Sequence, residues 1–412
     1  MKTTSFLTIL FFLILFSFKT FAQGEAAVPF LLLNPSPSLS AMGQTGTALP
    51  TEDPFGFIWN PAQLGYNSLN NNLSFIFYPS KINLPSRINY GFELKGLAFN
   101  AGYNFKELIG FPLSFGFGYG NTKFYYLTPL YVRNIRPADD YNAYSFAVGI
   151  DYFVQLSIGY SIKNVSSTII PDLGEPITLT SETTVKDFGI LLKVPVVRLI
   201  DDNLLLPLNE GLSGKPTFDF SLGYSKSNIG DEISYIDWAQ ADPLPRIDRL
   251  GYGINAGFDL VSDNFKINAL NISFTVEADD ILIKRDPYSS NWSYQSTLSD
   301  LKFWKNIVQI EGDENILSHA ATKLEFVESF SYYFGHFFGR GYPDARETNG
   351  YEIRAKGLFK LWALWANDPI TDFLCDHFDI RYYNTNYFTN TWNETKMTGL
   401  AFYFHNLNEL FE

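Results

Sequence analysis

The chain has a single cysteine, Cys375, and only four histidines in 412 residues. One cysteine excludes an intramolecular disulfide, which is the usual covalent support of small secreted domains. The histidines are His319, His336, His377 and His405. They stand far apart without metal-ligand spacing, and the sequence contains no HExxH, GxSxG or phosphate-loop motif. The sequence therefore predicts no enzyme, no cofactor and no metal site.

Basic residues are also scarce: 30 Lys and Arg stand against 43 Asp and Glu, which gives a net charge of −13. An acidic chain repels a phosphate backbone, so nucleic acid is excluded as a partner. Three acidic pairs fall near the ends of expected strands: Asp139-Asp140, Asp201-Asp202 and Asp279-Asp280. We expect these acids in solvated loops at a rim, although acidic loops can also hold divalent cations.

Long apolar runs are confined to the N-terminus. Lys2 precedes an apolar run over residues 6–18, and Thr20-Phe21-Ala22 then provides a small-residue cleavage site. The run is too short for a membrane anchor, so residues 1–22 are predicted to be a secretory signal peptide. No later run reaches the roughly 18 apolar residues that a spanning helix needs.

Aromatic residues, by contrast, are abundant: they make up 17% of the chain, with 39 Phe and 25 Tyr. Many lie in short segments where bulky apolar residues alternate with small or polar ones. In 97–105 the odd positions hold Leu, Phe, Ala, Tyr and Phe, and the even positions hold Ala, Asn, Gly and Asn. Because a strand has a side-chain period of two, the two sets lie on opposite faces of a sheet.

Comparable stripes continue through the chain, at 113–119, 144–150, 156–162, 218–224, 252–258 and 272–276. The stretch 87–95 is expected to form a separate strand that pairs with 97–105. The count comes to about fourteen or fifteen strands, and an even number near fourteen is typical of a single-chain bacterial barrel.

Two fold classes are compatible with this pattern, and they differ in the side of the sheet on which the large residues lie. A water-soluble sandwich buries its large face, whereas an outer-membrane barrel points that face at lipid and lines its lumen with small polar residues. Heavy aromatic use suits the interfacial girdles of a barrel, and a secreted aromatic-rich carbohydrate binder is the alternative. We predict an all-β fold: a transmembrane antiparallel β-barrel of about 14 strands over residues 71–404, located in a bacterial outer membrane and in contact with its lipid.

Residues 23–70 differ from the rest, because they are rich in Pro, Ser, Gly and Asn and show no strand alternation. We predict that they form a hatch inside the barrel. Glycine weakens a strand interior, so its frequent use on the small-residue face, as at Gly116 and Gly118, indicates a lumen crowded by this plug. Within it, Asp53 as N-cap and Pro54 at the first helical position predict a short helix to Trp59, ended by Asn60 before a proline.

The longest interruption of the strand pattern is the insert 279–320. Outer-membrane barrels have short periplasmic turns and longer external loops, so this insert is predicted to be an extracellular loop with a helix near 301–310. It is either a partner-binding surface or a simple connection. The chain closes with a tail, 405–412, and the terminal aromatic residue of the barrel is either Phe404 or Phe411.

Part of the hatch resembles the N-terminal signature of the PorV/PorQ family, which belongs to the FadL-like group of outer-membrane barrels. The segment runs from Pro35 to Ala48 and continues through Asp53 to Trp59-Asn60-Pro61-Ala62 and Leu64. The matching residues are Met42, Gly43, Gly46, Asp53, Trp59, Asn60, Pro61, Ala62 and Leu64. Gln44 departs from the pattern, since a second glycine is common there. The motif covers about thirty residues, and the rest of the chain agrees only in strand pattern and length.

The resemblance implies a fourteen-stranded barrel with an N-terminal hatch, in which the Asn-Pro-Ala residues are structural or gating residues. It also implies a component of a type IX-like secretion system that binds or shuttles exported surface proteins, with secretion-machinery subunits or cargo as partners and the 279–320 insert as contact surface. The alternative is a FadL-like transporter of hydrophobic small molecules, with an apolar pocket above the hatch lined by Phe124, Tyr125, Tyr126 and Tyr131. A structural barrel without a transport role is the third hypothesis.

Overall fold

The computed structural model of the protein describes residues 26–69, 73–84, 91–127, 137–170, 178–209, 211–237, 241–262, 265–285, 291–366, 369–387 and 395–407. The predicted signal peptide, Tyr131 and Phe411 lie outside these residues. No helix in the described part of the chain is long and apolar enough to span a membrane.

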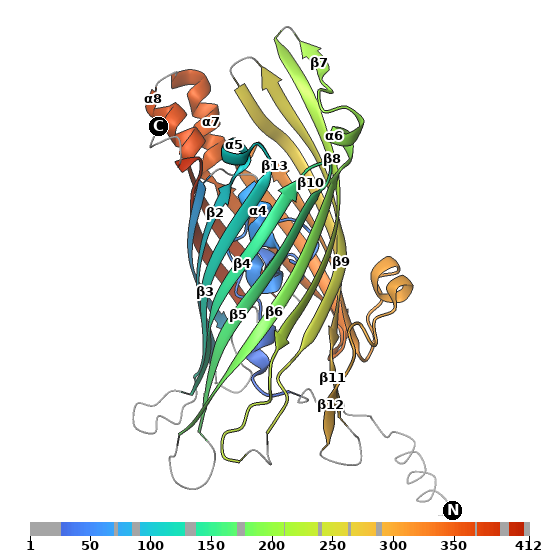
Figure 1. Cartoon of the computed structure of the whole chain (residues 1–412). Helices are drawn as coiled ribbons and strands as arrows, with labels where there is room; N and C mark the ends of the chain where they lie inside the picture. The colour runs from blue at the N-terminus through green and yellow to red at the C-terminus, as the bar shows by residue number, and fades with distance from the viewer. Residues whose placement is uncertain are drawn as a thin grey trace, which may run out of the picture.

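Fourteen antiparallel strands form a closed circuit within the described residues (Figure 1). They are β1 (Leu73–Leu84), β2 (Gly91–Asn104), β3 (Leu113–Leu127), β4 (Ala138–Asp151), β5 (Gln155–Ile169), β6 (Leu179–Pro195), β8 (Leu212–Ile229), β9 (Ile247–Ser262), β10 (Phe265–Ile281), β13 (Ile316–Phe326), β14 (Phe330–Gly339), β15 (Tyr342–Arg354), β16 (Phe378–Tyr387) and β17 (Thr395–Phe404). Strand β6 pairs with β8, and β1 pairs with β17, so each strand has a neighbour on both sides. The predicted barrel of about 14 strands is confirmed.

The outer wall of the barrel is apolar, as predicted. In β4 the large side chains Tyr144, Phe146 and Val148 are exposed, with Phe146 44% exposed, while Ser145 and Ala147 between them are buried in the lumen. A closed barrel satisfies every backbone hydrogen bond between its strands, which is the condition for strands to cross a bilayer. Its apolar exterior and small-residue interior are those of an outer-membrane barrel.

The expected pairing of 87–95 with 97–105 is wrong. The described residues 91–95 and residues 97–104 belong to the single strand β2, in which Gly96 pairs with Ser80 of β1 and with Thr122 of β3. Residues 87–90 lie outside the described residues. Gly96 resembles a strand break in the sequence, yet it keeps an extended backbone because both neighbouring strands continue the ladder past it.

The barrel has two rims, named here for what they carry. The terminal rim is where β1 begins and β17 ends; Figure 1 shows it at the top. It bears α5 (Lys106–Ile109), α6 (Val196–Ile200), β7 (Leu206–Asn209), α7 (Ala355–Ala366) and α8 (Pro369–His377). The opposite rim, the loop rim, bears β11 (Ile283–Arg285) and β12 (Trp292–Tyr294), and the π-helix η3 (Phe303–Val308) of the same connection lies beside the outer wall (Figure 1).

The hatch lies inside the barrel (Figure 1). It contains η1 (Pro29–Leu32), α2 (Pro37–Ala41), α3 (Gly56–Trp59) and α4 (Gln63–Leu69). Helix α3 begins two residues later than an Asp53 N-cap implies, and its N-cap is Phe55. The Asp53 carboxylate instead accepts a hydrogen bond from the Phe55 backbone N–H at 2.8 Å, which forms a turn before the helix. Asn60 ends the helix as expected.

Glycines on the lumen face of the strands lie against the hatch backbone. A Cβ added at any of five of them would come under 3.0 Å from a hatch backbone atom: Gly116, Gly149, Gly159, Gly223 and Gly335. Such contacts do not occur in real structures, so only glycine lets the hatch backbone approach the wall this closely. The unusual glycine content of the strands is thus explained by the plug.

The insert between β10 and β13 folds back over the outer wall of the barrel. It starts after Ile281 and ends before Ile316, so it is shorter than 279–320. The Leu298 N–H donates to Asp248 at 2.8 Å, and the Asp300 N–H donates to Asp280 at 3.0 Å. Within it, the π-helix η3 occupies the place of the helix predicted near 301–310.

Two of the three acidic pairs do not lie in loops. Asp139 lies in β4 and Asp279 in β10, and both carboxylates are buried inside the barrel. Asp279 faces Arg249 at 3.5 Å and His319 at 3.4 Å. Inward positions can hold an acid here because cationic and hydrogen-bonding side chains meet it in the lumen. Only Asp201-Asp202, between α6 and β7, is exposed as expected.

Replacing Gly159 by alanine tests the fit between the wall and the hatch. The new Cβ would overlap Pro61 and Ala62 backbone atoms, so we expect a loss of about 1–3 kcal/mol of stability and faster amide exchange in the hatch. The control is Gly257→Ala, because the atoms nearest its added Cβ are side-chain ends of the wall, led by Thr217 Oγ1. Hydrogen exchange and the melting temperature of the barrel provide the measurement. Equal effects of the two substitutions would contradict a close hatch–wall contact.

Candidate functional site

A buried carboxylate of the wall holds the middle of the hatch. Glu277 of β10 accepts three consecutive backbone N–H groups, from Gly46 at 3.0 Å, Thr47 at 2.8 Å and Ala48 at 3.0 Å. Successive N–H groups that point at one spot form an anion-binding nest. Because hydrogen bonds to a charged acceptor are about twice as strong as neutral ones, this contact is a principal anchor of the hatch.

The turn at Gly43 is the second anchor. Its N–H donates to Thr348 Oγ1 at 2.9 Å, and its carbonyl lies 2.6 Å from His319 Nδ1. Gly43 has φ +65°, and an added Cβ would lie 2.9 Å from the His336 carbonyl oxygen, so this position requires glycine. Gln44 follows with φ +64° and so adopts the left-handed conformation that a second glycine would favour.

Asp53 organises the hatch from within. Its buried carboxylate accepts hydrogen bonds from Ser36 Oγ at 2.7 Å, Ser38 Oγ at 2.5 Å and the Phe55 N–H. These bonds tie the start of α2 to the loop before α3. The residue is therefore placed to fix the internal fold of the hatch, while the contact to the wall is made by its neighbour, Glu52.

The Asn-Pro-Ala motif is the part of the hatch that faces strands β5 and β6. Asn60 Nδ2 donates to the carbonyl of Thr47 at 2.7 Å and to that of Ile190 at 3.2 Å, and its Oδ1 accepts the Ala62 N–H at 3.0 Å. Ser157 Oγ donates to the Ala62 carbonyl at 2.5 Å. Pro61 and Ala62 meet Gly159, so the motif forms one of the close backbone contacts between hatch and wall.

The three remaining residues of the predicted set are buried packing residues. The Trp59 ring lies 3.9 Å from the guanidinium of Arg249, a cation–π contact with β9. Leu64 packs on Gly116 and Gly118, and Met42 is in a small cluster with Tyr333. With Gly46 at the Glu277 nest, the structure places all nine predicted residues in the hatch or at its contact with the wall.

An ionic network holds the hatch on the side of the terminal rim. Arg381 of β16 pairs with Glu52 of the hatch and with Asp379, 2.7 Å from its Nε. Arg354 of β15 pairs with Glu325 at 3.0 Å and lies 3.9 Å from Glu52. Both arginines, Glu325 and Asp379 are largely buried, whereas the Glu52 side chain is 40% exposed. Each charge has a partner of opposite sign, which is the condition for keeping charges inside a protein.

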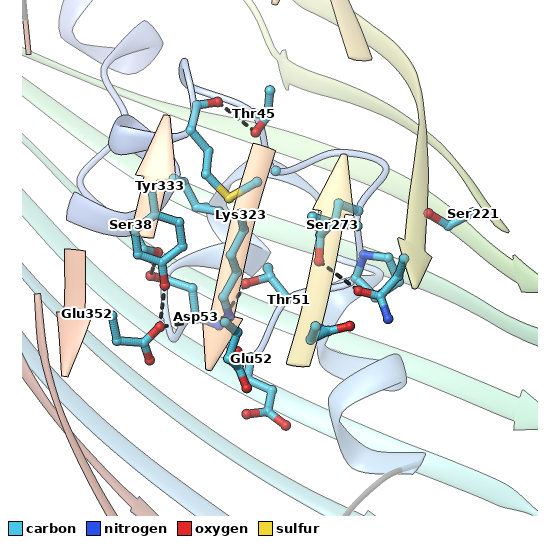
Figure 2. Close-up of a pocket in the computed structure, with 18 of the residues that line it drawn as sticks. Ser38, Thr45, Thr51, Glu52, Asp53, Ser221, Ser273, Lys323, Tyr333 and Glu352 are labelled. Atoms are coloured by element: carbon cyan, nitrogen blue, oxygen red, sulfur yellow. Dashed lines mark hydrogen bonds and ion pairs between the residues drawn. The ribbon is translucent and has the colours of Figure 1, made fainter. Parts of the chain in front are cut away.

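The network borders a cavity of about 220 Å³ between the hatch and the wall. Figure 2 shows Glu52 and Asp53 of the hatch together with Lys323, Tyr333 and Glu352 of the strands around it. Charged and hydrogen-bonding groups dominate this lining. The cavity is therefore suited to water or polar groups and unsuited to a purely apolar molecule.

Toward the loop rim the lumen is closed by apolar contacts instead. Phe30 of η1 stacks on Tyr141 at 5.6 Å and on Phe124 at 6.4 Å between ring centroids, and Val28 and Leu31 belong to the same cluster. This is the place where an apolar pocket was predicted. The pocket is filled by the chain's own Phe30, while the hydroxyl of Tyr126 donates to Asp139 at 2.5 Å.

The outer insert has its own ion pair. Lys305 Nζ donates to Asp313 at 2.8 Å. Partial burial opposes ionisation of Asp313, but the hydrogen bonds from Lys305 and from the backbone of Asn315 and Ile316 lower its pKa below the ordinary value. The pair therefore stays ionised at neutral pH and links η3 to the segment that leads into β13.

Sequence analysis missed the wall residues that hold the hatch: Glu277, His319, Thr348, Arg354 and Arg381. The available signal was a charge or histidine on the small-residue face of a strand. Glu277, for instance, is on the opposite face from Phe274 and Val276 in the sequence pattern. A charge facing a lumen needs a partner, and that partner could have been sought in the hatch.

No family model matches the chain, and none of the curated proteins matches it. Solved structures share the barrel architecture at low identity. The toluene transporter TbuX of Ralstonia pickettii is 10% identical, with 90% of this chain and 97% of that chain covered and a TM-score of 0.39. The toluene transporter TodX of Pseudomonas putida is 9% identical, with 91% of this chain and 98% of that chain covered and a TM-score of 0.39. The transport unit of the autotransporter AIDA-I from Escherichia coli is 10% identical, with 81% of this chain and 90% of that chain covered and a TM-score of 0.38.

At these identities and scores the likeness carries no argument about what this chain does. The resemblance to the PorV/PorQ family is not shown by any of these comparisons, and membership of that family stays a prediction.

Glu277→Gln tests the nest. The amide keeps one acceptor but loses the charge, and its NH₂ group faces backbone donors, so we expect a cost of about 1–3 kcal/mol to hatch binding. Amide exchange of residues 46–48 should accelerate, and the single-channel conductance in planar bilayers should rise. Asp140→Asn is the control, because Asp140 pairs with Lys123 of the adjacent strand at 3.7 Å. Unchanged exchange in the Glu277 variant would remove this contact from the anchors of the hatch.

Proposed function

We propose that this outer-membrane barrel admits small, largely apolar molecules, and that the hatch is the gate of the passage. The observation that carries the proposal is the occupation of the aromatic niche between Phe124 and Tyr141 by Phe30, a residue of the hatch itself. A molecule of similar chemistry can compete for that niche.

The hatch is attached by reversible contacts, which a gate requires. Hydrogen bonds and ion pairs hold its centre and its terminal-rim side, as at Glu277 and Arg381. Residues 26–33 rely instead on apolar packing, with one backbone hydrogen bond from Ala27 to Pro243 at 2.9 Å. The apolar end is therefore the part of the hatch that a hydrophobic ligand can displace first.

The free energies involved are small enough for a ligand to replace this apolar packing. Exposing a buried side chain of the size of Phe30 or Leu31 costs roughly 1.5–3 kcal/mol. A ligand that covers the vacated surface offsets most of this cost. The anchors at Glu277 and Glu52 need not break in this first step, so the two halves of the hatch can respond separately.

The orientation of the barrel follows from its connections. Both ends of an even-stranded barrel lie at one rim, and external loops are the longer ones. The 34-residue connection between Ile281 and Ile316 lies at the loop rim, so this rim faces outside. Ligands would meet the apolar niche first and the polar cavity, with its charged lining, second.

The hypothesis of a secretion-system component that binds exported proteins stays a prediction, as does that of a purely structural barrel. The insert, which the first hypothesis uses as a contact surface, lies on the outer wall over Asp248 and Asp280. Deleting residues 291–309 and measuring cargo binding would test it independently of the niche.

Entry of 1-N-phenylnaphthylamine into intact Gram-negative cells tests the proposal. Cells that express the protein should take up this apolar probe several-fold faster than cells with an empty vector. Phe30→Ala should accelerate entry further, because it empties the niche and removes roughly 2 kcal/mol or more of hatch packing. Phe146→Ala, which removes the same side chain from the outer wall, is the matched control and should leave entry unchanged.

A large polar antibiotic must remain excluded from the same cells, which separates gating from general leakage. Equal entry with the wild type, the Phe30 variant and the empty vector would overturn the proposed function.

A further inference from the structure

Large apolar side chains are exposed around the terminal rim. They occur on four of the strand connections there: on α5 and after it, between β4 and β5, on α6 and around β7, and on α7–α8. The residues are Leu108, Ile109, Phe111, Tyr152, Phe153, Leu199, Ile200, Leu205, Leu206, Leu208, Leu358, Leu361, Trp362, Ile370 and Phe373. We call this set the apolar collar. Turns that only faced water would have no physical reason to be so apolar.

The largest part of the collar is amphipathic. On α7, Leu358, Leu361 and Trp362 share the exposed face, since helix neighbours are three and four residues apart. The opposite face of α7 and the inner face of α8 are fixed to the barrel. Lys360 of α7 pairs with Glu328 at 2.8 Å, and Thr371 and Cys375 of α8 are buried. The polar side thus holds the rim, and the apolar side is turned outward.

The collar continues the lipid-facing surface of the barrel. Helix α7 follows β15 without a linker, and the outward Ile353 of β15 precedes it by two residues. Tyr152 and Phe153 similarly join the outward Val148 of β4 to the outward Leu156 of β5. An apolar surface that is continuous with the membrane-facing wall has lipid as its natural neighbour.

The positions of the collar residues around the barrel show whether a bilayer or a protein partner covers them. Its residues follow β2, β4, β6 and β15, which lie at separate places around the strand circuit. A protein partner would cover one sector or cap the opening, whereas only the bilayer surrounds the barrel. We propose that the apolar collar is an interfacial anchor, inserted into the lipid leaflet at the terminal rim.

Known physical behaviour of helices at membranes agrees with this position. Helices with one apolar and one polar face lie in the interfacial plane and bury the apolar face about 5–10 Å into the headgroup boundary. Trp362 has the amphipathic ring that is enriched at that depth. The collar then fixes the height and tilt of the barrel against the leaflet, because its helices cannot move along the membrane normal without exposing apolar surface.

Nitroxide labels on single cysteines test the anchor in proteoliposomes. In a Cys375→Ala background, Leu108→Cys, Ile200→Cys and Trp362→Cys report on three sectors of the collar, at residues that are 70%, 80% and 55% exposed in the protein. Ile236→Cys is the matched control, because Ile236 is 70% exposed but lies between β8 and β9 at the loop rim. Collision rates with oxygen, which enriches in lipid, and with a nickel chelate, which stays in water, give the depth of each label.

We expect an oxygen-to-chelate ratio several-fold higher than at Ile236 at two or more of the three collar positions. Ratios equal to that at Ile236 at two or more positions would place the collar in water and overturn the proposal. This outcome is independent of the gating function, since transport of an apolar probe and the depth of the rim are measured separately.

A second measurement needs no label. The part of the tryptophan emission that disappears in Trp362→Phe should be quenched by brominated phospholipids and protected from aqueous iodide. Quenching by iodide alone would again contradict insertion. Heat-modifiable migration in gels confirms that each variant contains a folded barrel.

Discussion

The width of the barrel is the constraint on which the rest of the structure depends. Fourteen strands enclose a lumen that their own side chains do not fill, so a separate part of the chain has to occupy it. The solution is a compact hatch that packs its backbone directly on glycines of the wall, as at Gly159. Packing backbone on backbone leaves polar groups to satisfy, and buried hydrogen bonds such as those to Glu277 and from Asn60 satisfy them in the middle of the lumen.

The two ends of the lumen differ in the physics that closes them. Near the terminal rim, charges of the hatch and the wall neutralise each other, with Glu52 between Arg354 and Arg381. Near the loop rim, Phe30 and its aromatic neighbours exclude water. Ionic contacts in a buried site depend strongly on geometry, whereas apolar contacts exchange readily with other apolar molecules. The hatch is therefore held by ion pairs at one end and by apolar contacts at the other.

Much of this architecture is predictable from the sequence, because a period of two over many segments marks the strands and the face that meets lipid. The place of the hatch also follows, since a plug that crowds the lumen is one reason for glycine on the small-residue face. Errors arose where local signals conflict with long-range pairing. Gly96 resembles a turn but continues a ladder with two neighbours, and Asp279 lies beside a loop-like sequence but meets Arg249 and His319. The anchors of the hatch could not be identified, because the partners of Glu277 are more than 220 residues away in the chain.

The pairing of β1 with β17 has a consequence for assembly. The hatch precedes every strand in the chain, yet it is bound by Thr348 and Thr385, which are among the last residues to be exported. The wall cannot close until β17 arrives, because β17 pairs with both β16 and β1. The final strand therefore both seals the cylinder and completes the wall around the hatch. Such long-range contacts make folding slow and leave strand edges unpaired until the last strand is in place.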